Sequence, residues 1–258
     1  MASHRLLTAE REHRILQLLK GQRVVSVAEL SGTLGVSEAT VRRDLHELAR
    51  RGALTRVRGG ASIGEDPRVE PLFADKEGKQ STEKERIARR ALELIEDHDC
   101  IYLDGGSTVL ALARLLDERL DLTIVTNSLM AAAELMESRH RLILVGGEFR
   151  AISRTLVGPL SQPIVSALNV DKAFMGTIGF VAADGLTTTD PSEAFTKTEI
   201  MKRAGRVILL ADHTKFGKRS LARSEGAIHA IVTDCIDPEL RARLTELEIE
   251  VLTPDDQA

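Results

Sequence analysis

Apolar residues recur at helical spacing in three short segments at the start of the chain. The first predicts a helix over residues 8–20, and Ser26 and Ser37 are suited to cap the second and third helices. Gly35 ends the second helix only two residues before the cap of the third. Two helices around a tight glycine turn are typical of a helix-turn-helix.

The third helix is followed by a different pattern. Val41, Leu45 and Leu48 lie on one face of the helix and are expected in a core. Residues 54–60 then alternate apolar and basic side chains, as the strands of a hairpin do. The N-terminal segment is therefore predicted to be a winged helix-turn-helix.

The polar side of the third helix carries side chains suited to nucleic acid: Ser37, Glu38, Thr40, Arg42 and Arg43. They crowd the first two turns, which a recognition helix presents to the major groove, where arginine can donate two hydrogen bonds to guanine. In the wing, Arg56 and Arg58 are expected to point the same way, toward phosphates. Asp44 is expected to be structural and to orient an arginine, because phosphate repels an outward carboxylate. The alternative is a protein-binding three-helix module.

Charge supports the nucleic-acid interpretation. Residues 1–62 contain 11 Lys and Arg against 6 Asp and Glu, whereas the rest contains 24 against 33. A basic end joined to an acidic body favours a polyanion as the partner of that end. Aromatic residues make up only 3% of the 258 residues, which argues against a base-stacking platform for single strands.

Beyond residue 61 the pattern changes twice. Residues 62–78 contain two prolines, two glycines and scattered charge, which predicts a linker. A helical pattern over 82–95 is then followed by strand-length apolar runs at Cys100–Leu103, Leu122–Val125, Leu142–Val145, Lys172–Met175, Val207–Ala211, Ala230–Thr233 and Ile249–Leu252. Most are apolar on both faces, which predicts an α/β domain with a mostly parallel sheet covered on two sides. The predicted domains are 1–61, a winged helix-turn-helix; 62–78, a linker; and 79–258, an effector-sensing α/β domain.

Small polar residues follow several of these runs. They are Asp104, Gly105, Gly106, Ser107 and Thr108; Thr126, Asn127 and Ser128; Gly146 and Gly147; Gly176; and Asp212, His213, Thr214 and Lys215. The carboxyl ends of parallel strands bind ligands, and glycines with free N–H groups favour a phosphate, to which Lys215 adds positive charge. His213 is expected to line the site or to cap a helix. The alternative is that each turn needs its glycine or asparagine for geometry alone.

A resemblance to the DeoR family of bacterial regulators lies in the run VSVAELSGTLGVSEATVRRDLHELARRGALTRVRGGA. The family signature is Ser-x-x-Thr-[IV]-Arg-Arg-Asp-Leu followed by a basic segment that closes on Gly-Gly-Ala. This chain has Ser37, Thr40, Val41, Arg42, Arg43, Asp44, Leu45, Gly59, Gly60 and Ala61 at those positions. The resemblance covers roughly residues 8–235 and implies a repressor of carbohydrate catabolism that binds double-stranded operator DNA.

For the C-terminal domain, the resemblance implies a fold like that of ribose-5-phosphate isomerases and CoA transferases. It also implies an effector site for a phosphorylated sugar or related metabolite at the strand ends, and adds Asp184 and Gly185 to the residues above. Two turns depart from the family. Residues 104–108 read DGGST where DSGTT is more usual, and His213-Thr214 replaces a serine pair. Because the glycines and hydroxyl groups of these turns are kept, a sugar-phosphate site is expected. The altered residues allow this site a different ligand selectivity.

The rival function is an active sugar-phosphate isomerase tethered to DNA. Isomerisation needs a carboxylate base together with an acid or cation. The related isomerases carry an acidic Asp-Gly-Ala-Asp turn where residues 176–179 hold no carboxylate. Glu193 and Glu199 lie near the expected glutamate, but on a helix that begins near Pro191 such residues are more often solvated. We therefore predict binding without turnover and no catalytic residues.

Neither a cofactor nor a metal is expected. Cys100 and Cys235 are far apart and beside apolar runs, which favours small core residues, and the seven histidines have no metal-ligand spacing. The chain lacks a signal-peptide pattern and an apolar run of about 18 residues, so the cytoplasm is expected and a membrane is not. One helix-turn-helix makes few DNA contacts, which argues for a homodimer or homotetramer.

Overall fold

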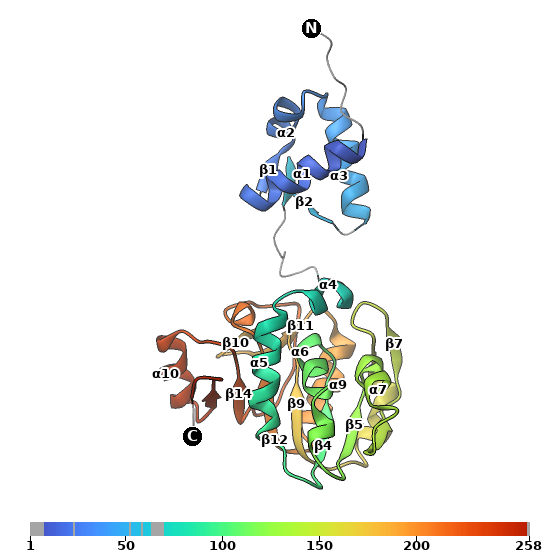
Figure 1. Ribbon diagram of the computed structural model, residues 1–258, viewed down its shortest axis with the longest axis vertical. Coiled ribbons are helices and arrows are strands. Elements are labelled where there is room, and N and C mark those ends of the chain that lie inside the picture. Colours follow the sequence, from blue (N-terminus) through green and yellow to red (C-terminus); the bar gives the residue numbers. More distant parts are fainter. Residues whose placement is uncertain (1–7, 23, 52, 58, 63–69, 257–258) are drawn as a thin grey trace. The chain divides into compact units, whose positions relative to one another are not determined.

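The structure of the protein is a computed structural model that describes residues 8–22, 24–51, 53–57, 59–62 and 70–256. The chain divides into two compact units, residues 1–66 and 67–258 (Figure 1). This division falls inside the stretch predicted as a linker, while the bounds 1–61, 62–78 and 79–258 stay a prediction. Among the described residues no helix combines the length and the apolar character needed to cross a membrane.

The first unit is the predicted winged helix-turn-helix. Its elements are α1 (Thr8–Gln22), β1 (Val24–Ser26), α2 (Val27–Leu34), α3 (Glu38–Arg50), β2 (Thr55–Val57) and β3 (Gly60–Ser62). The strands form an antiparallel sheet in the order β1-β3-β2, so the wing has a third strand that the sequence did not predict. Val41 and Leu45 of α3 pack with Ile15 and Leu19 of α1, and all four are fully buried.

The helix ends follow local chemistry. Ser26 Oγ accepts a hydrogen bond from the Glu29 N–H at 3.1 Å, and the Glu29 carboxylate accepts one from the Ser26 N–H at 2.9 Å. This capping box starts α2. Gly35 ends α2 in the left-handed conformation, with φ of 65°. In contrast, α1 continues through Gly21, because a glycine lowers helix stability by only about 1 kcal/mol.

The second unit contains a seven-stranded parallel sheet. In spatial order its strands are β15 (Glu250–Leu252), β14 (Ala230–Val232), β12 (Ala204–Leu210), β9 (Val170–Met175), β4 (Cys100–Leu103), β5 (Thr123–Thr126) and β6 (Arg141–Leu144). Every neighbouring pair in this sheet is parallel. Each strand overlaps one of the seven predicted runs, so the predicted fold class is confirmed.

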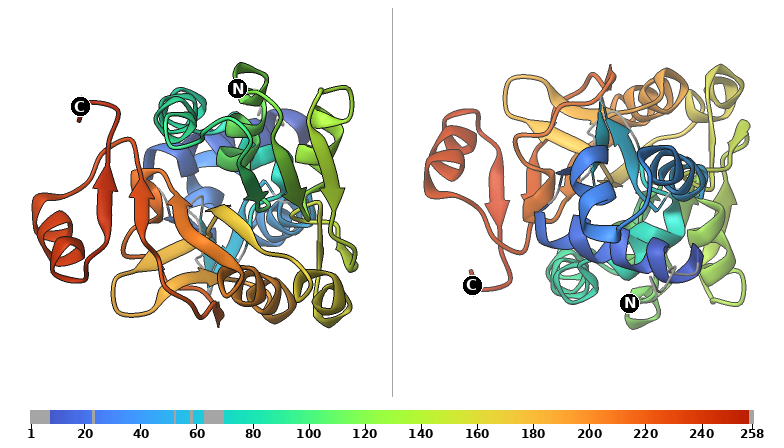
Figure 2. Two further views of the ribbon diagram at one scale, coloured as in Figure 1. Left: turned by 90° about the horizontal axis from the view of Figure 1, so that it is seen from below. Right: turned by 90° about the horizontal axis from the view of Figure 1, so that it is seen from above.

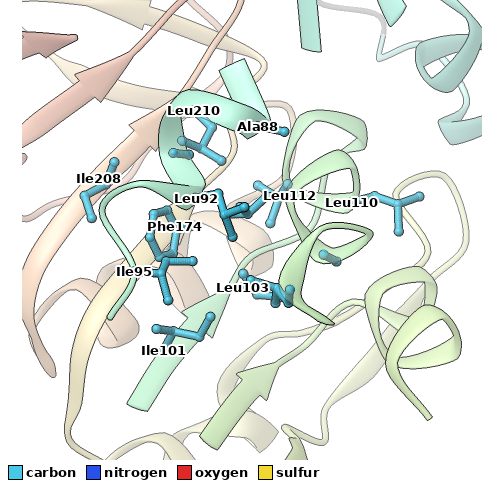
Figure 3. Packing of buried hydrophobic residues seen from close by; sticks show 14 of the residues in the cluster. Ala88, Leu92, Ile95, Ile101, Leu103, Leu110, Leu112, Phe174, Ile208 and Leu210 are labelled. Atoms are coloured by element: carbon cyan, nitrogen blue, oxygen red, sulfur yellow. The ribbon is translucent and has the colours of Figure 1, made fainter. Parts of the chain in front are cut away.

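Helices cover both faces of this sheet (Figure 2). On one face lie α5 (Ser81–Leu92), α6 (Ser107–Ala113) and α7 (Leu129–Leu135), and on the other α8 (Gln162–Val165) and α9 (Pro191–Met201). Figure 3 shows the first core, in which Ile95 lies beside Ile101 and Phe174. Tyr102 belongs to the core on the other face, so β4 is apolar on both sides.

Shorter elements complete the second unit. They are α4 (Phe73–Gly78), η1 (Leu116–Glu118), η2 (Pro159–Ser161), η3 (His213–Lys215), α10 (Pro238–Glu246), the β7–β8 hairpin (Glu148–Arg150 and Thr155–Val157) and a small antiparallel sheet of β10 (Gly179–Val181), β11 (Gly185–Thr188) and β13 (Ala222–Arg223). The sequence did not predict the hairpin or the small sheet. The hairpin follows the end of β6, and the small sheet begins beyond the end of β9, so both position residues near the carboxyl ends of the main strands.

Candidate functional site

The N-cap and the first two turns of α3 hold the residues of this helix that are predicted to contact DNA. Ser37 caps the helix, since its Oγ accepts a hydrogen bond from the Thr40 N–H at 3.3 Å. Arg42 donates to Glu38 at 2.8 Å, one turn earlier. Arg43 is exposed and has neither an ion pair nor a side-chain hydrogen bond with the described residues. Of the two arginines, Arg43 therefore has its donors available to a base, whereas Arg42 must first leave a carboxylate.

Asp44 lies on the inner side of α3, where it is buried. Its two oxygens accept hydrogen bonds from Arg11 of α1, from Nε at 2.8 Å and from Nη2 at 3.0 Å. This bonding raises the pKa of Arg11. Asp44 thus joins two helices, which confirms the expectation that it is structural, and the arginine that it orients is Arg11 of α1 rather than one of the exposed arginines of α3.

The wing supplies one described arginine. Arg56 is exposed on β2, opposite the fully buried Ala61 of β3. Arg58 lies outside the described residues. The structure therefore does not test the expectation that Arg56 and Arg58 point the same way. Contacts of either arginine with phosphate stay predictions.

The second unit brings most of the predicted effector residues to one edge. The strands β12, β9, β4, β5 and β6 are neighbours in this order, so the turns after their carboxyl ends lie side by side. We call these turns, residues 104–108, 126–128, 146–147, 176 and 212–215, the strand-end site.

The centre of the strand-end site is a close contact between two turns. The Gly176 N–H after β9 donates to Asp104 Oδ2 after β4 at 3.0 Å. A side chain at Gly176 would place its Cβ 2.5 Å from the carbonyl oxygen of Gly105, a distance that no real contact allows. Gly106, with φ of 137°, then leads into Ser107 at the start of α6. The glycines are therefore required for this backbone approach.

Several predicted effector residues beside this contact form hydrogen bonds or a helix cap within the protein. Thr126 Oγ1 donates to a carbonyl of β4 at 2.7 Å, and Ser128 caps α7 by accepting a hydrogen bond at 3.2 Å. A Cβ at Gly147 would lie 2.8 Å from the backbone of β8. Asn127 donates to β8 through Nδ2 at 3.1 Å, but its buried Oδ1 has no hydrogen-bond partner among the described residues. Thr108 is buried at the start of α6.

At the end of β12, Asp212 caps η3 and is buried, and Lys215 ends η3 half-exposed. His213 is fixed to the neighbouring strand end: its N–H donates to Asp234 Oδ1 at 2.8 Å, and its Nδ1 lies 2.6 Å from Asp234 Oδ2. Burial raises the pKa of Asp234, but the bonds from His213 outweigh it and lower that pKa. Together with Cys235, these two side chains form the single group of metal-ligating atoms within 4.8 Å of one another that occurs in the described part of the chain.

The two cysteines are less buried than expected. Cys235 is exposed, whereas Cys100 is half-buried and packs against the core on the second face of the sheet. The reason is their position at strand ends: Cys100 is the first residue of β4, and Cys235 follows the last buried residues after β14.

Asp184 and Gly185 make their contacts outside the strand-end site. They form the turn between β10 and β11, where Asp184 pairs with Arg219 and Gly185 has φ of 74°. Within the described ranges, no hydrogen bond or ion pair joins them to the other predicted effector residues. Their proposed role in the site therefore rests on the resemblance alone.

A buried lysine that the sequence did not indicate lies at the centre of the strand-end site. Lys197 of α9 is 2% exposed, and its Nζ bonds Asp104 Oδ2 and, at 3.0 Å, the Gly176 carbonyl. Burial lowers the pKa of Lys197, but the carboxylates of Asp104 and Glu193 outweigh this and raise it, so the lysine is charged. Glu193, one turn earlier, lies 3.4 Å from the Lys197 Nζ and is itself buried. The expectation that Glu193 is solvated is wrong, because α9 presents this face to the sheet edge.

A second chain of ion pairs extends from Glu193. Arg150, at the end of β7, lies 3.3 Å from the Glu193 carboxylate, 3.4 Å from that of Asp190 and 2.7 Å from that of Glu70. Glu70 also accepts from Lys76 at 2.7 Å. We call these seven residues the ionic cluster: Glu70, Lys76, Asp104, Arg150, Asp190, Glu193 and Lys197. It links the turn after β4 to the residues just before α4.

The protonation states of this cluster differ. Burial raises the pKa of Glu193, and the charges of Glu70 and Asp104 add to this effect, although Lys197 and Arg150 oppose it. Burial also raises the pKa of Glu70, but Lys76 and Arg150 outweigh it and lower that pKa. The neighbouring cations therefore favour the ionised form of Glu70, whereas burial favours the protonated form of Glu193.

The arrangement contains the carboxylates that the sequence had suggested were missing from an isomerase. Asp104 and Glu193 are both beside Lys197, so an acid–base pair and a cation are present at the strand-end site. Both carboxyls are buried and engaged in ion pairs. Glu199, the other residue considered, pairs with Lys202 at 2.7 Å away from this cluster. Geometry alone thus permits anion binding and does not separate a sensor from an enzyme.

Sequence reasoning missed Lys197, Arg150 and Glu70 because each lies outside the turns that follow the main strands. One signal was available: Glu193 and Lys197 stand four residues apart, beside Ala194, Ile200 and Met201 on the buried face of α9. A charged pair on the buried face of a helix indicates a polar site rather than a solvated surface. For Glu70 and Arg150 the sequence carries no such signal.

Comparisons with known proteins separate sensor from enzyme. Residues 11–66 match the model of the DeoR-like helix-turn-helix domain, and residues 79–235 match that of the DeoR C terminal sensor domain. The chain is 37% identical to the uncharacterized HTH-type transcriptional regulator FruR of Bacillus subtilis, over 86% of this chain and 88% of that one. It is 34% identical to the glycerol-3-phosphate regulon repressor of Escherichia coli, over 89% and 92%. Among solved structures, ribose 5-phosphate isomerase A of Methanocaldococcus jannaschii is similar at 20% identity and a TM-score of 0.40, over 52% and 54%.

Proposed function

This chain belongs to the DeoR family of DNA-binding transcriptional regulators, and from that premise we propose that it represses genes for the use of a phosphorylated sugar or polyol. The observation that supports this most directly is the combination, in one chain, of an exposed arginine on a capped recognition helix with an anion-suited strand-end site. The relatives are named as regulators, which supports a regulator over an isomerase, and the proposal assigns to the strand-end site binding without turnover.

The DNA-binding part of the proposal assigns a role to each exposed residue. Arg43 reads a base in the major groove, Arg42 and Thr40 contact DNA beside it, and Arg56 and Arg58 contact phosphates from the wing. Ser37 and Glu38 position the start of the helix. A single unit of this size makes too few contacts for operator affinity, so the protein acts as a homodimer or homotetramer on repeated half-sites. Because it must reach the chromosome, its proposed location is the cytoplasm.

The effector part assigns the strand-end site to a small phosphorylated sugar, polyol or related metabolite. The glycine turns at 104–106 and 176 allow the backbone to approach an anion, and Ser107, Thr108 and Asn127 offer polar groups. Lys215 supplies positive charge. One relative is named a glycerol-3-phosphate regulon repressor, which supports a ligand that combines hydroxyls with a phosphate.

The experiment begins with an operator fragment selected by the full-length protein from random duplex DNA. A thermal-shift screen of sugar and polyol phosphates, including glycerol 3-phosphate, then identifies ligands, and gel shifts measure their effect on operator affinity. Effector and operator affinities must be linked reciprocally, so operator DNA should weaken effector binding by the same factor. A ligand that binds equally with and without operator would contradict the proposed regulation.

A further inference from the structure

Residues 70–79 are the first described part of the second unit along the chain, and they are held to it at several points. Glu70 is 6% exposed and pairs with Arg150, and Phe73 is 1% exposed with its N–H bonded to the Ile152 carbonyl at 3.0 Å. At the other end, the Lys84 ammonium bonds the carbonyls of Lys76 and Lys79. Figure 1 shows α4, the helix in this segment, at the edge of the unit where the chain enters. This segment is the described part of the second unit that is nearest in sequence to the DNA-binding unit.

Arg150 is shared among three carboxylates, yet not all of its donors are used. Its guanidinium faces Glu70, Asp190 and Glu193, and its buried Nη1 has no hydrogen-bond partner among the residues described. In the ionic cluster as a whole, four carboxyls stand against three cations: Asp104, Glu193, Glu70 and Asp190 against Lys197, Arg150 and Lys76. A phosphate at the adjoining strand-end site adds negative charge to this group. The guanidinium fork is the donor set that suits phosphate best.

Lys84, which bonds the same segment, is also influenced by charges at the other side of the strand-end site. Burial lowers the pKa of Lys84; the positive charges of Lys215 and Lys76 act the same way, and the Asp212 carboxylate opposes them. Asp212 and Lys215 are proposed effector residues, so the ammonium that closes the end of α4 lies in their electrostatic field. Both ends of residues 70–79 are thus held by cations that an anion at the strand-end site would attract.

We propose that Arg150 binds the anionic group of the effector and, in doing so, gives up its ion pair with Glu70, which releases residues 70–79 and lowers operator affinity. This inference rests on the proposed function, because it assigns a residue and a transmission path to the same effector site. The effector shifts the equilibrium because Arg150 bonds it only when Glu70 is released. Coupling of this kind typically amounts to about 5- to 150-fold in affinity.

Glu70→Gln in the full-length protein tests the path without any ligand, since it removes the charge that holds Arg150 and keeps the shape. The matched control is Glu118→Gln, which removes an exposed carboxylate paired with Arg89. We expect Glu70→Gln to raise amide hydrogen exchange in residues 73–80 and to weaken binding to the selected operator by about fivefold or more, while Glu118→Gln matches the wild type. Wild-type exchange and wild-type operator affinity in Glu70→Gln would overturn the proposal.

Arg150→Lys tests the binding step and guards against a variant that only unfolds. Lysine keeps the positive charge for Glu70 but loses the fork. With glycerol 3-phosphate as the probe and inorganic phosphate as a second, we expect Arg150→Lys to bind the probe at least about fivefold more weakly than the wild type. In the wild type the bound probe should raise exchange in residues 73–80. Probe binding that leaves this exchange unchanged, or equal probe affinity in Arg150→Lys, would contradict the inference. If neither probe binds the wild type, the assigned ligand class fails, and the ligand-free Glu70→Gln comparison still decides the path.

Discussion

Asp44 of α3 accepts two hydrogen bonds from Arg11 of α1, at 2.8 and 3.0 Å, and thereby fixes the recognition helix against the helix behind it. Asp44→Asn should therefore lower the free energy of unfolding of the first unit by about 1–3 kcal/mol, because it leaves a charged donor with a poorer partner. Thermal unfolding followed by circular dichroism measures this. Glu38→Gln is the matched control: its pair with Arg42 is exposed, so its effect should stay below about 0.5 kcal/mol.

The two neighbouring arginines of α3 should differ in their effect on sequence preference. Arg43→Ala is expected to weaken operator binding and to relax preference at one base position by about 1–3 kcal/mol, because its donors are available for a bidentate contact. Arg42→Ala should have the smaller effect, since Arg42 is already paired with Glu38. Binding to a set of single-base operator variants measures both. Equal discrimination by Arg43→Ala and the wild type would remove Arg43 from base reading.

The wing arginines should act on all DNA alike. Arg56→Ala is expected to lower affinity uniformly across operator variants and to reduce the slope of log affinity against log salt by about 1, because one phosphate contact is lost. The sequence makes the same prediction for Arg58→Ala. Fluorescence anisotropy across a salt series provides the measurement. A change confined to one base position would show that the wing reads sequence.

Lys215 should separate sensing from DNA binding. Lys215→Ala is expected to leave operator affinity unchanged and to weaken the response to an anionic effector by at least about fivefold, because it removes positive charge from the strand-end site. Lys202→Ala, an exposed lysine paired with Glu199 at the end of α9, is the control. Gel shifts with and without effector measure the response. Equal loss of DNA binding in Lys215→Ala would place the residue outside a sensor site.

The turn after β9 should not tolerate a side chain. Gly176→Ala would bring a Cβ to 2.5 Å from the Gly105 carbonyl oxygen, so one of the two turns must shift. We expect a loss of about 1–3 kcal/mol in stability and weaker effector binding. In Gly146→Ala, by contrast, the nearest atom is Ile164 Cδ1 at 3.7 Å, an ordinary contact. Melting temperatures of the two variants compare them directly, and equal values would contradict the close contact.

The stability of the second unit should depend on pH through Glu193. Burial, together with Glu70 and Asp104, raises the pKa of Glu193 in the folded protein. A raised pKa stabilises the fold fully below the unfolded value of 4.5, and this contribution is lost as the pH rises through the folded value. Glu193→Gln should therefore gain stability relative to the wild type as the pH is raised from 4.5. Denaturant midpoints across this range test it, and a difference that does not change with pH would contradict it.

The sequence predicted the elements whose causes are local. Ser26 and Ser37 start their helices through bonds within three residues, and Gly35 ends α2 through its own conformation. Most strands of the large sheet are short runs apolar on both faces, so they could be found without their neighbours. The hairpin β7–β8 and the small sheet β10-β11-β13 were not found, because β7 is largely exposed and the other strands are short segments of two to four residues in which apolar side chains alternate with glycine, threonine or arginine.

The sequence by itself determined that a basic helix-turn-helix precedes a parallel α/β unit with glycine-rich turns at its strand ends. Only the tertiary structure decided which charges meet there. Lys197 bonds Asp104 across 93 positions of the chain, and Thr189 bonds Glu70 across 119. Capping and periodicity act over a few residues and leave a trace in the sequence. Ion pairs between distant segments leave none, because any buried charge can find its partner only when the sheet has brought the segments together.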